Sequence, residues 1–198
     1  VIGQQFVQDA VEELVSERVR GNVPELVEAL MQKRLVRLEQ REFALEQTYR
    51  FGHILIRDAT YRGLLKASRA VLHERFVGWA DRVNQDRDRA AEYEEILGYH
   101  LEQAHSNLAD LGPLDEHGMG LGRRAAERLS SAGRRAFARA DMPAAANLLR
   151  RAATVLPERD PSRLELIPDL GEALLEVGEF PWAELFLEEA IDAHREEE

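Results

Sequence analysis

The chain has 198 residues, contains no cysteine and carries a formal net charge of −11 at pH 7. Its length is sufficient to bury a core in one elongated domain or in two small ones. The lack of cysteine excludes disulfides, thiolate chemistry and Cys-based zinc sites and fits a reducing cytoplasm, the expected location. No apolar run reaches the length of about 18 residues that a membrane span requires, so no membrane association is expected.

The chain begins with Val1-Ile2-Gly3, which has neither an initiator methionine nor the basic segment of a signal peptide. We therefore expect a fragment of a longer protein and interpret these residues as the tail of a truncated helix. Apolar residues at helical spacing predict a helix over Gln5–Val15. After a break at Arg20-Gly21-Asn22, Pro24 is suited to open a second helix, which extends to Val36.

The pattern then changes from helical spacing to alternation. From Phe43 to Phe51 every second residue is apolar except Gln47, which is typical of a strand. Leu35–Glu39 is the expected partner strand, with a turn at Gln40-Arg41-Glu42. Two helices followed by a hairpin form the back part of a winged helix. Residues 1–88 are therefore predicted to be a truncated winged-helix-like module together with the helices that follow it.

Helical spacing resumes at His53. One helix is predicted through Leu65 and, after a break at Ala67-Ser68, a second one over Leu72–Val83. A third helix is predicted over Ala90–Leu108. The next segment, from residue 110 to residue 122, contains one proline and four glycines and is predicted to be a loop.

The second half of the chain repeats itself at a spacing of 38 residues. Each unit has a glycine followed at fixed offsets by small and bulky residues, as in a tetratricopeptide repeat. The first unit has Gly133, Ala136, Ala145, Leu149, Ala152 and Pro157, and the second has Gly171, Leu174, Ala183, Leu187 and Ala190, with Arg195 in place of the proline. The usual spacing is about 34 residues, and the additional residues are assigned to Arg159-Asp160-Pro161-Ser162, between helices.

Small residues in such a unit allow its two helices to cross closely, and the leucine fills the space between units. Because two units alone are marginal, the helix over Ala90–Leu108 is expected to stack on the first one. Residues 89–198 are predicted to form tetratricopeptide-like repeats, with the clearest units at about 123–157 and 162–195. The predicted fold is mainly α: a partial winged helix with one small β-hairpin, followed by an α–α superhelix.

Charge is unevenly distributed along these repeats. Arg123–Arg151 contains eight arginines and two acidic residues, a net charge of +6. Glu158–Glu198 contains 14 acidic and three basic residues, a net charge of −11. Neighbouring helices of opposite charge can complement each other within the fold, or the basic segment can form a patch for an acidic partner.

No motif predicts an active site or a metal site. Gly118-Met119-Gly120-Leu121-Gly122 precedes a helix but lacks the preceding strand and the Lys-Ser/Thr pair of a phosphate-binding loop, so a flexible loop is expected. His100 and His105 are five residues apart and therefore diverge around a helix instead of sharing a zinc-binding face. No serine is accompanied by a recognisable base, so no catalytic residue and no metal ligand is assigned.

One segment resembles a known protein family. Tyr49–Tyr61 reads YRFGHILIRDATY and is followed by Arg69 and by Leu72-His73. It resembles the segment F-x-H-x-L-I-R-D-x-x-Y … R-x-x-L-H of bacterial STAND-type signalling ATPases, which often carry an adenylate/guanylate cyclase domain, or a kinase or DNA-binding domain. Further similarities to this family lie at Val1–Phe6, which resembles its V-I-G-R-x-F sequence, at Tyr99-His100 with Ala104, and at Ala132–Ala136.

The resemblance implies a non-catalytic regulatory and protein-interaction region of a multidomain, nucleotide-driven ATPase that controls a cyclase or another output domain. The parent protein would bind ATP or ADP, and the partners would be its ATPase core, other protomers or another protein. In related ATPases of the apoptotic and plant-resistance type, a winged-helix histidine contacts the ADP phosphate. His53 is the corresponding candidate, although Gly52 and Ile54 replace the flanking Met and Asp. Alternatively, His53 packs the hairpin against the helix, and Arg57-Asp58 is an ion pair or an inter-domain contact.

A winged helix also permits a different function, that of a DNA-binding transcriptional regulator. Its recognition helix would be Pro24–Val36, which offers Lys33 and Arg34 but also Glu25 and Glu28. The overall negative charge argues against nucleic acid as a partner. The regulatory role in a signalling ATPase is therefore the preferred hypothesis.

Overall fold

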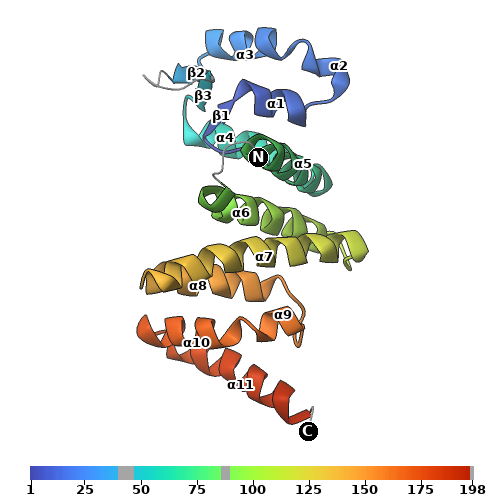
Figure 1. The fold of residues 1–198 in the computed structure, drawn as a ribbon. Coiled ribbons are helices and arrows are strands. Elements are labelled where there is room, and N and C mark those ends of the chain that lie inside the picture. Colours follow the sequence, from blue (N-terminus) through green and yellow to red (C-terminus); the bar gives the residue numbers. More distant parts are fainter. Residues whose placement is uncertain (40–46, 86–89, 197–198) are drawn as a thin grey trace. The chain divides into compact units, whose positions relative to one another are not determined.

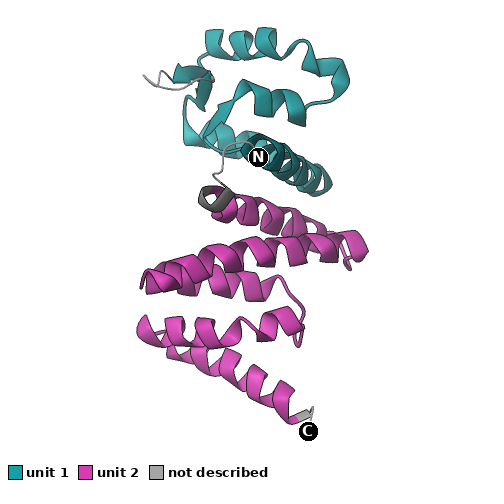
Figure 2. Cartoon of the chain, viewed as in Figure 1, with its two compact units in different colours: residues 1–86 teal, residues 87–198 magenta. Residues whose placement is uncertain are grey.

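The structure is a computed structural model that describes residues 1–39, 47–85 and 90–196. The protein is mainly helical with a small antiparallel sheet, as the sequence predicts. The chain divides into two compact units, Val1–Asp86 and Arg87–Glu198 (Figure 2). The predicted turn at Gln40-Arg41-Glu42 and the beginning of the strand predicted from Phe43 lie outside the described residues.

The first unit combines a small sheet with a series of helices (Figure 1). In chain order its elements are β1 (Gln5–Val7), α1 (Gln8–Leu14), α2 (Glu17–Arg20), α3 (Val23–Gln32), β2 (Val36–Glu39), β3 (Thr48–Phe51), α4 (Ile54–Arg62) and α5 (Lys66–Gln85). β3 is the central strand and pairs antiparallel with β1 and β2, with Val36 opposite Phe51. The predicted hairpin pairing is confirmed, and β1 is an additional strand that the sequence pattern did not reveal.

The helix predicted over Gln5–Val15 is wrong at its start, because Gln5–Val7 form β1 and α1 follows. Phe6 stacks on Tyr49 with 5.8 Å between the ring centroids. This cross-strand aromatic contact and the pairing with β3 favour extended backbone where the apolar spacing alone fits a helix. The interpretation of Val1-Ile2-Gly3 as a helix tail is also wrong, because none of the three is helical and the glycine has a φ of 144°.

The core of the first unit lies between the sheet and the helices. One buried cluster consists of Val23, Val27, Val36 and Tyr49, with Phe6, Val11, Val15, Met31 and Phe51 packed against it. A second cluster consists of Ala10, Leu14 and Phe76. α3 presents Val27 to the core but leaves Leu26 49% and Leu30 38% exposed, so its outer side is apolar.

The break between the last two helices of this unit comes earlier than the predicted one at Ala67-Ser68. α4 ends at Arg62 and α5 begins at Lys66. The Arg69 guanidinium closes the turn: its Nε donates to the Leu64 carbonyl at 3.0 Å and its Nη2 to the Arg62 carbonyl at 2.9 Å. Carbonyls at a helix end lack partners within the helix, so a side chain of the next helix determines where α4 stops.

The second unit is a series of antiparallel helices (Figure 1). They are α6 (Ala90–Ala109), α7 (Glu116–Ala138), α8 (Met142–Thr154), α9 (Pro161–Leu164), α10 (Ile167–Glu176) and α11 (Phe180–Glu196). α6 packs on α7, α7 on α8, α8 on α10 and α10 on α11. The largest buried core joins α7, α8, α10 and α11, while α6 stacks on α7 as expected for the helix over Ala90–Leu108.

The loop predicted from Asp110 to Gly122 is wrong in its second half. α7 begins at Glu116, and the Asp115 side chain caps it by accepting the Gly118 N–H at 2.8 Å. The glycine-rich stretch predicted to be a flexible loop therefore forms the first turns of a long helix.

The reason for a glycine in this helix is close packing. A Cβ at Gly122 would lie 2.7 Å from the Val155 carbonyl oxygen and 2.9 Å from His105 Cε1. No side chain fits at that position, because α7 passes directly beside α6 and the end of α8. The sequence pattern suggests a loop at this glycine, but in the structure the glycine allows the α7 backbone to approach its neighbours closely.

The two helix hairpins of the second unit are built in the same way. A Cβ at Gly133 of α7 would lie 2.9 Å from Leu149 Cδ2 of α8. A Cβ at Gly171 of α10 would lie 2.9 Å from Leu187 Cδ2 of α11. In both hairpins the glycine allows the leucine of the second helix to lie against the backbone of the first. The leucine therefore makes this contact within its own unit, whereas the sequence predicts it between units.

The turns of the two hairpins also correspond. Ala140, between α7 and α8, has a φ of 58°, and Gly178, between α10 and α11, has a φ of 79°. They are 38 residues apart, the spacing of the sequence repeat. The residues assigned to the insertion, Arg159-Asp160-Pro161-Ser162, lie between α8 and α10, where Asp160 caps α9 by accepting the Ser162 N–H at 2.9 Å.

Candidate functional site

The residues of the Tyr49–Tyr61 motif and its continuation meet around the Tyr61 ring, between α4 and α5. The Tyr61 hydroxyl and His73 Nε2 form a hydrogen bond of 2.9 Å. The Arg69 and Arg57 guanidinium carbons lie 4.7 Å and 5.3 Å from the ring centroid, within the range of cation–π contacts. We refer to these four residues (Arg57, Tyr61, Arg69 and His73) as the Tyr61 cluster.

Most polar atoms of the Tyr61 cluster are engaged within the protein. His73 is 1% exposed, and Arg69 donates to the two carbonyls at the end of α4. Arg57 forms the expected ion pair with Asp58 at 2.9 Å, whereas its Nε is buried without a hydrogen-bond partner among the described residues. The cluster therefore stabilises the α4–α5 corner and retains one open donor, on Arg57.

His53 begins α4 as the sequence predicts. Its Nδ1 accepts the Leu55 N–H at 3.1 Å and so caps the helix. A ring nitrogen that accepts a hydrogen bond carries no proton, so in the neutral imidazole the hydrogen is on Nε2. The side chain is exposed, and Nε2 is thus presented as a donor at a helix N-terminus, which favours anions. Its contact with a nucleotide phosphate remains a prediction.

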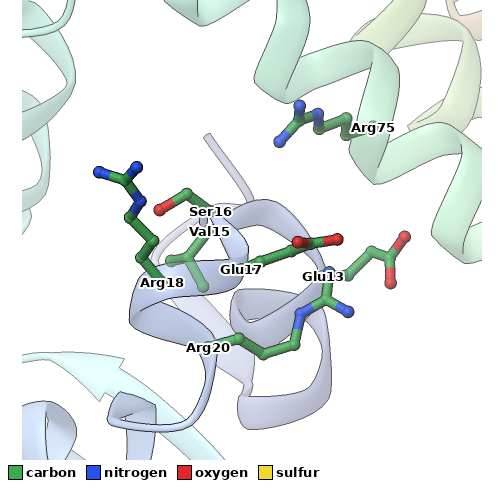
Figure 3. Close-up of a pocket in the computed structure, with 7 residues that line it drawn as sticks. All are labelled: Glu13, Val15, Ser16, Glu17, Arg18, Arg20 and Arg75. Atoms are coloured by element: carbon green, nitrogen blue, oxygen red, sulfur yellow. The ribbon is translucent and has the colours of Figure 1, made fainter.

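A cavity of about 510 Å³ opens beside the turn between α1 and α2. Figure 3 shows Arg75 of α5 reaching toward this turn, which is flanked by Glu13 of α1 and Glu17 of α2. Glu13 is already paired with Arg82 at 2.6 Å. Of the seven lining residues, Val15 alone is apolar. The volume would suit a small molecule, but such sites have mostly apolar walls with a few converging polar groups, so this cavity does not indicate a particular ligand.

Arginines of the basic segment form ion pairs with helices on both sides. Toward α10 and α11, the pairs are Arg134 with Asp169 at 3.4 Å and Arg150 with Glu179 at 2.6 Å. Toward α6, they are Arg128 with Glu94 at 2.5 Å and Arg151 with Glu102 at 2.6 Å. The expected complementarity with the acidic segment is confirmed for the first two pairs, whereas the last two are directed to the preceding helix.

The Arg151–Glu102 pair is the most constrained of these contacts. Arg151 Nε lies 3.1 Å from both carboxylate oxygens, and Nη2 lies 2.6 Å from one of them. The hydrogen bonds to Glu102 raise the pKa of the guanidinium against the opposing effect of burial. The pair connects α8 directly to α6.

Arg163 of α9 connects three parts of the second unit. Its Nε and Nη2 each lie 2.7 Å from an oxygen of Glu189 in α11. Its Nη1 donates to the carbonyls of Ala153 and Leu156 at 2.9 Å and 3.2 Å. The guanidinium therefore holds the end of α8, α9 and α11 together.

The basic patch considered from the sequence corresponds to a cavity of about 550 Å³ beside α7. Arg123, Arg124 and Arg134 line it together with Glu127 and Glu165. Because two carboxylates share the cavity with the three guanidinium groups, its charge is partly compensated. The patch is weaker as an anion site than the sequence count suggests.

His100 and His105 serve packing and hydrogen bonding. His100 is 2% exposed, and His105 Nδ1 donates to the Gly118 carbonyl at 3.0 Å. In residues 1–39, 47–85 and 90–196, no group of three or more His, Asp or Glu side chains is arranged to hold a metal ion. No helix in the part of the chain that the structure describes is long and apolar enough to cross a membrane.

Sequence reasoning identified the segment of the Tyr61 cluster but not its contacts. Tyr61 and His73 are 12 residues apart and lie on different helices. With the break placed at Ala67-Ser68, Arg69 does not reach the end of the preceding helix. A helix break predicted at Gly63 would have brought these side chains together. No protein-family model matches this chain, and no curated protein matches it.

Proposed function

We propose that this chain is a non-catalytic regulatory and protein-interaction region of a multidomain, nucleotide-dependent signalling ATPase. The Tyr61 cluster is the observation that carries the proposal. The residues through which the chain resembles STAND-type ATPases are distributed over two helices, yet Tyr61, Arg69 and His73 are in contact. Residues that form one motif for a structural reason are expected to lie together in the fold, as these three do.

The geometry of the second unit supports the interaction role. Its hairpins repeat at 38 residues with matching glycine–leucine contacts and matching turns, which is the construction expected of tetratricopeptide-like repeats. Several large apolar side chains on α10 and α11 are between 47% and 62% exposed: Leu175, Phe180, Trp182, Leu185 and Ile191. Of these, Leu175, Phe180 and Ile191 occupy positions whose counterparts in the first hairpin are covered, and exposed apolar patches are typical of surfaces that bind other proteins. The output domain, such as a nucleotide cyclase, belongs to another part of the parent protein.

In the parent protein His53 is the proposed sensor of the ADP phosphate. Its imidazole offers Nε2–H to an acceptor because Nδ1 is used to cap α4. The α4 N-terminus adds a favourable dipole for the same anion.

The gene provides the first test. A phosphate-binding loop sequence encoded upstream of residue 1 in the same reading frame supports the proposal, and a parent protein without a nucleotide-binding motif contradicts it. The second test compares His53→Ala with His53→Asn in the full-length protein. Asparagine is an effective helix N-cap, so both variants release ADP about tenfold faster only if the imidazole itself contacts the nucleotide. Unchanged ADP affinity in His53→Asn refutes the sensor role.

The DNA-binding alternative has less support from the surface of α3. The side of this helix that would enter a groove exposes Leu26 and Leu30, together with Glu25 and Glu28. Leucines and carboxylates contribute neither phosphate contacts nor counterion release. A gel-shift titration with duplex DNA decides the question, because salt-sensitive binding by this chain would favour the regulator.

A further inference from the structure

The repeat in the second unit allows its last helix to be compared with an equivalent helix that is covered. Three apolar residues of the first hairpin pack against the core to which α10 contributes: Phe137, Met142 and Ala153. The residues 38 positions later are Leu175, Phe180 and Ile191, with exposed fractions of 47%, 62% and 50%. The same positions are therefore covered in the first hairpin and uncovered in the second.

The covering element in the first hairpin shows what kind of structure fits such a surface. α10 packs on α8 with an apolar stripe of Ile167, Leu170 and Leu174, each 0% exposed. The spacing is i, i+3 and i+7, which is typical of an amphipathic helix bound in a groove.

The charges at the equivalent positions differ. In the first hairpin Arg150 of α8 pairs with Glu179, which follows α10, at 2.6 Å. The residue 38 positions after Arg150 is Glu188, and the one 38 positions after the buried Ala146 is Glu184; both glutamates are exposed. A helix on the outer side of α11 would face carboxylates where α10 and its turn face a guanidinium.

We propose that the outer side of α11 binds an amphipathic helix of a partner protein with Lys or Arg residues along its flank. We refer to the surface formed by Leu175, Phe180, Glu184, Glu188 and Ile191 as the α11 docking face. The apolar residues would receive a stripe spaced as in α10, and the two glutamates select a basic partner. A second copy of this chain would bring the same carboxylates against each other, which disfavours a homodimer through this face. The inference rests on the interaction role proposed above and specifies its partner.

The test uses the intact chain and a pair of labelled synthetic peptides of about 18 residues, long enough to form a helix on binding. Both peptides carry leucines at the α10 spacing, and their flanks carry either Lys or Glu. In fluorescence anisotropy titrations, the Lys peptide should bind at least about tenfold more tightly than the Glu peptide. The double variant Glu184→Lys/Glu188→Lys should reverse this preference.

Apolar substitutions test the other half of the surface. Phe180→Ser/Ile191→Ser should weaken binding of the Lys peptide by about tenfold or more. Leu185→Ser is the matched control. Leu185 is 54% exposed on the same helix, and the residue 38 positions earlier, Asn147, is also exposed, so Leu185 does not occupy a position that is covered in the first hairpin. Circular dichroism would verify that each variant remains folded, as expected for exposed positions.

Three outcomes would overturn the proposal. If the Lys and Glu peptides bind with equal affinity, the face does not select by charge. If a Lys peptide with serines in place of its leucines binds as tightly as the original Lys peptide, the binding is only non-specific charge attraction. A dimer in light scattering that Phe180→Ser/Ile191→Ser disrupts would assign the face to a second copy. A further repeat encoded directly after residue 198 would also overturn the proposal, because it would assign the face to the same chain. None of these outcomes bears on the ATPase proposal, which depends on a nucleotide-binding motif upstream and on ADP retention.

Discussion

Gly120 and Gly122 occupy neighbouring positions in α7 but have different surroundings. A Cβ at Gly120 would have no described atom within 4 Å. A Cβ at Gly122 would lie 2.7 Å from the Val155 carbonyl oxygen and 2.9 Å from His105 Cε1, and contacts below 3.0 Å require a neighbour to move. Alanine at these two positions therefore tests both the helix and its packing.

The expected magnitudes follow from two opposing effects. Replacing glycine by alanine in a helix interior favours the folded state by about 1 kcal/mol, so Gly120→Ala should raise the free energy of unfolding by roughly 0.5–1 kcal/mol. Gly122→Ala has the same propensity gain, but its methyl must displace a backbone carbonyl. Overpacking costs about 1–3 kcal/mol, and the upper part of this range applies because the displaced atom is a backbone oxygen, so this variant should be net destabilised by up to about 2 kcal/mol.

Urea unfolding measured by Trp182 fluorescence provides the assay. The chain has two tryptophans, and a Trp79→Phe background leaves the reporter of the second unit. The midpoint should shift up for Gly120→Ala and down for Gly122→Ala. If Gly122→Ala is as stable as Gly120→Ala, the close approach of α7 to α6 and α8 is refuted, and the segment is the flexible loop that its composition predicts.

Three further predictions concern the turns, the inserted segment and the Tyr61 cluster. Ala140→Gly should stabilise the second unit and Gly178→Ala should destabilise it, each by about 1 kcal/mol, because both residues have positive φ; opposite signs in thermal unfolding would refute the equivalence of the turns. Arg163→Met should lower the unfolding free energy by roughly 2–3 kcal/mol, because it leaves a carboxylate that is 17% exposed without its partner, and a midpoint in urea equal to that of the parent chain would contradict the proposed connection. Tyr61→Phe should destabilise the first unit by roughly 1 kcal/mol because it removes the hydrogen bond to His73 Nε2, which is buried, as measured by Trp79 fluorescence; a neutral effect would indicate that the hydrogen bond contributes little.

The elements that the sequence predicts correctly are those in which the apolar spacing recurs several times within the element. α6 and α8 are long enough for the apolar spacing to be unambiguous. The repeat identifies a glycine and a leucine in each hairpin, but their contact with each other is visible only in the structure. β1 has three residues, and its Phe6 and Val7 fit the helical spacing that Ala10 and Val11 continue in α1. It is extended because β3 pairs with it, and a partner more than forty residues away leaves no local signal.

The sequence predicts a loop at the first glycines of α7 for a related reason. Locally, glycines close to a proline indicate a break in structure. At Gly122 the requirement comes from His105 and Val155, on other helices, and neither is visible to a local pattern. For the candidate site, the position of His53 at a helix start could be predicted, whereas the Tyr61–His73 contact depends on a helix end that the side chain of Arg69 determines.

The Arg151–Glu102 pair has a consequence for how the second unit opens. A linear array of hairpins can lose its end helix first, since each hairpin contacts its neighbours alone. Here α8 is joined to α6 across 49 residues of sequence, past the helix between them. Fraying of α6 then requires breaking a pair that also holds α8. In hydrogen exchange, the slowly exchanging amides of α6 should therefore be released only by openings that also break this pair, so α6 should be better protected than an end helix held by its neighbour alone.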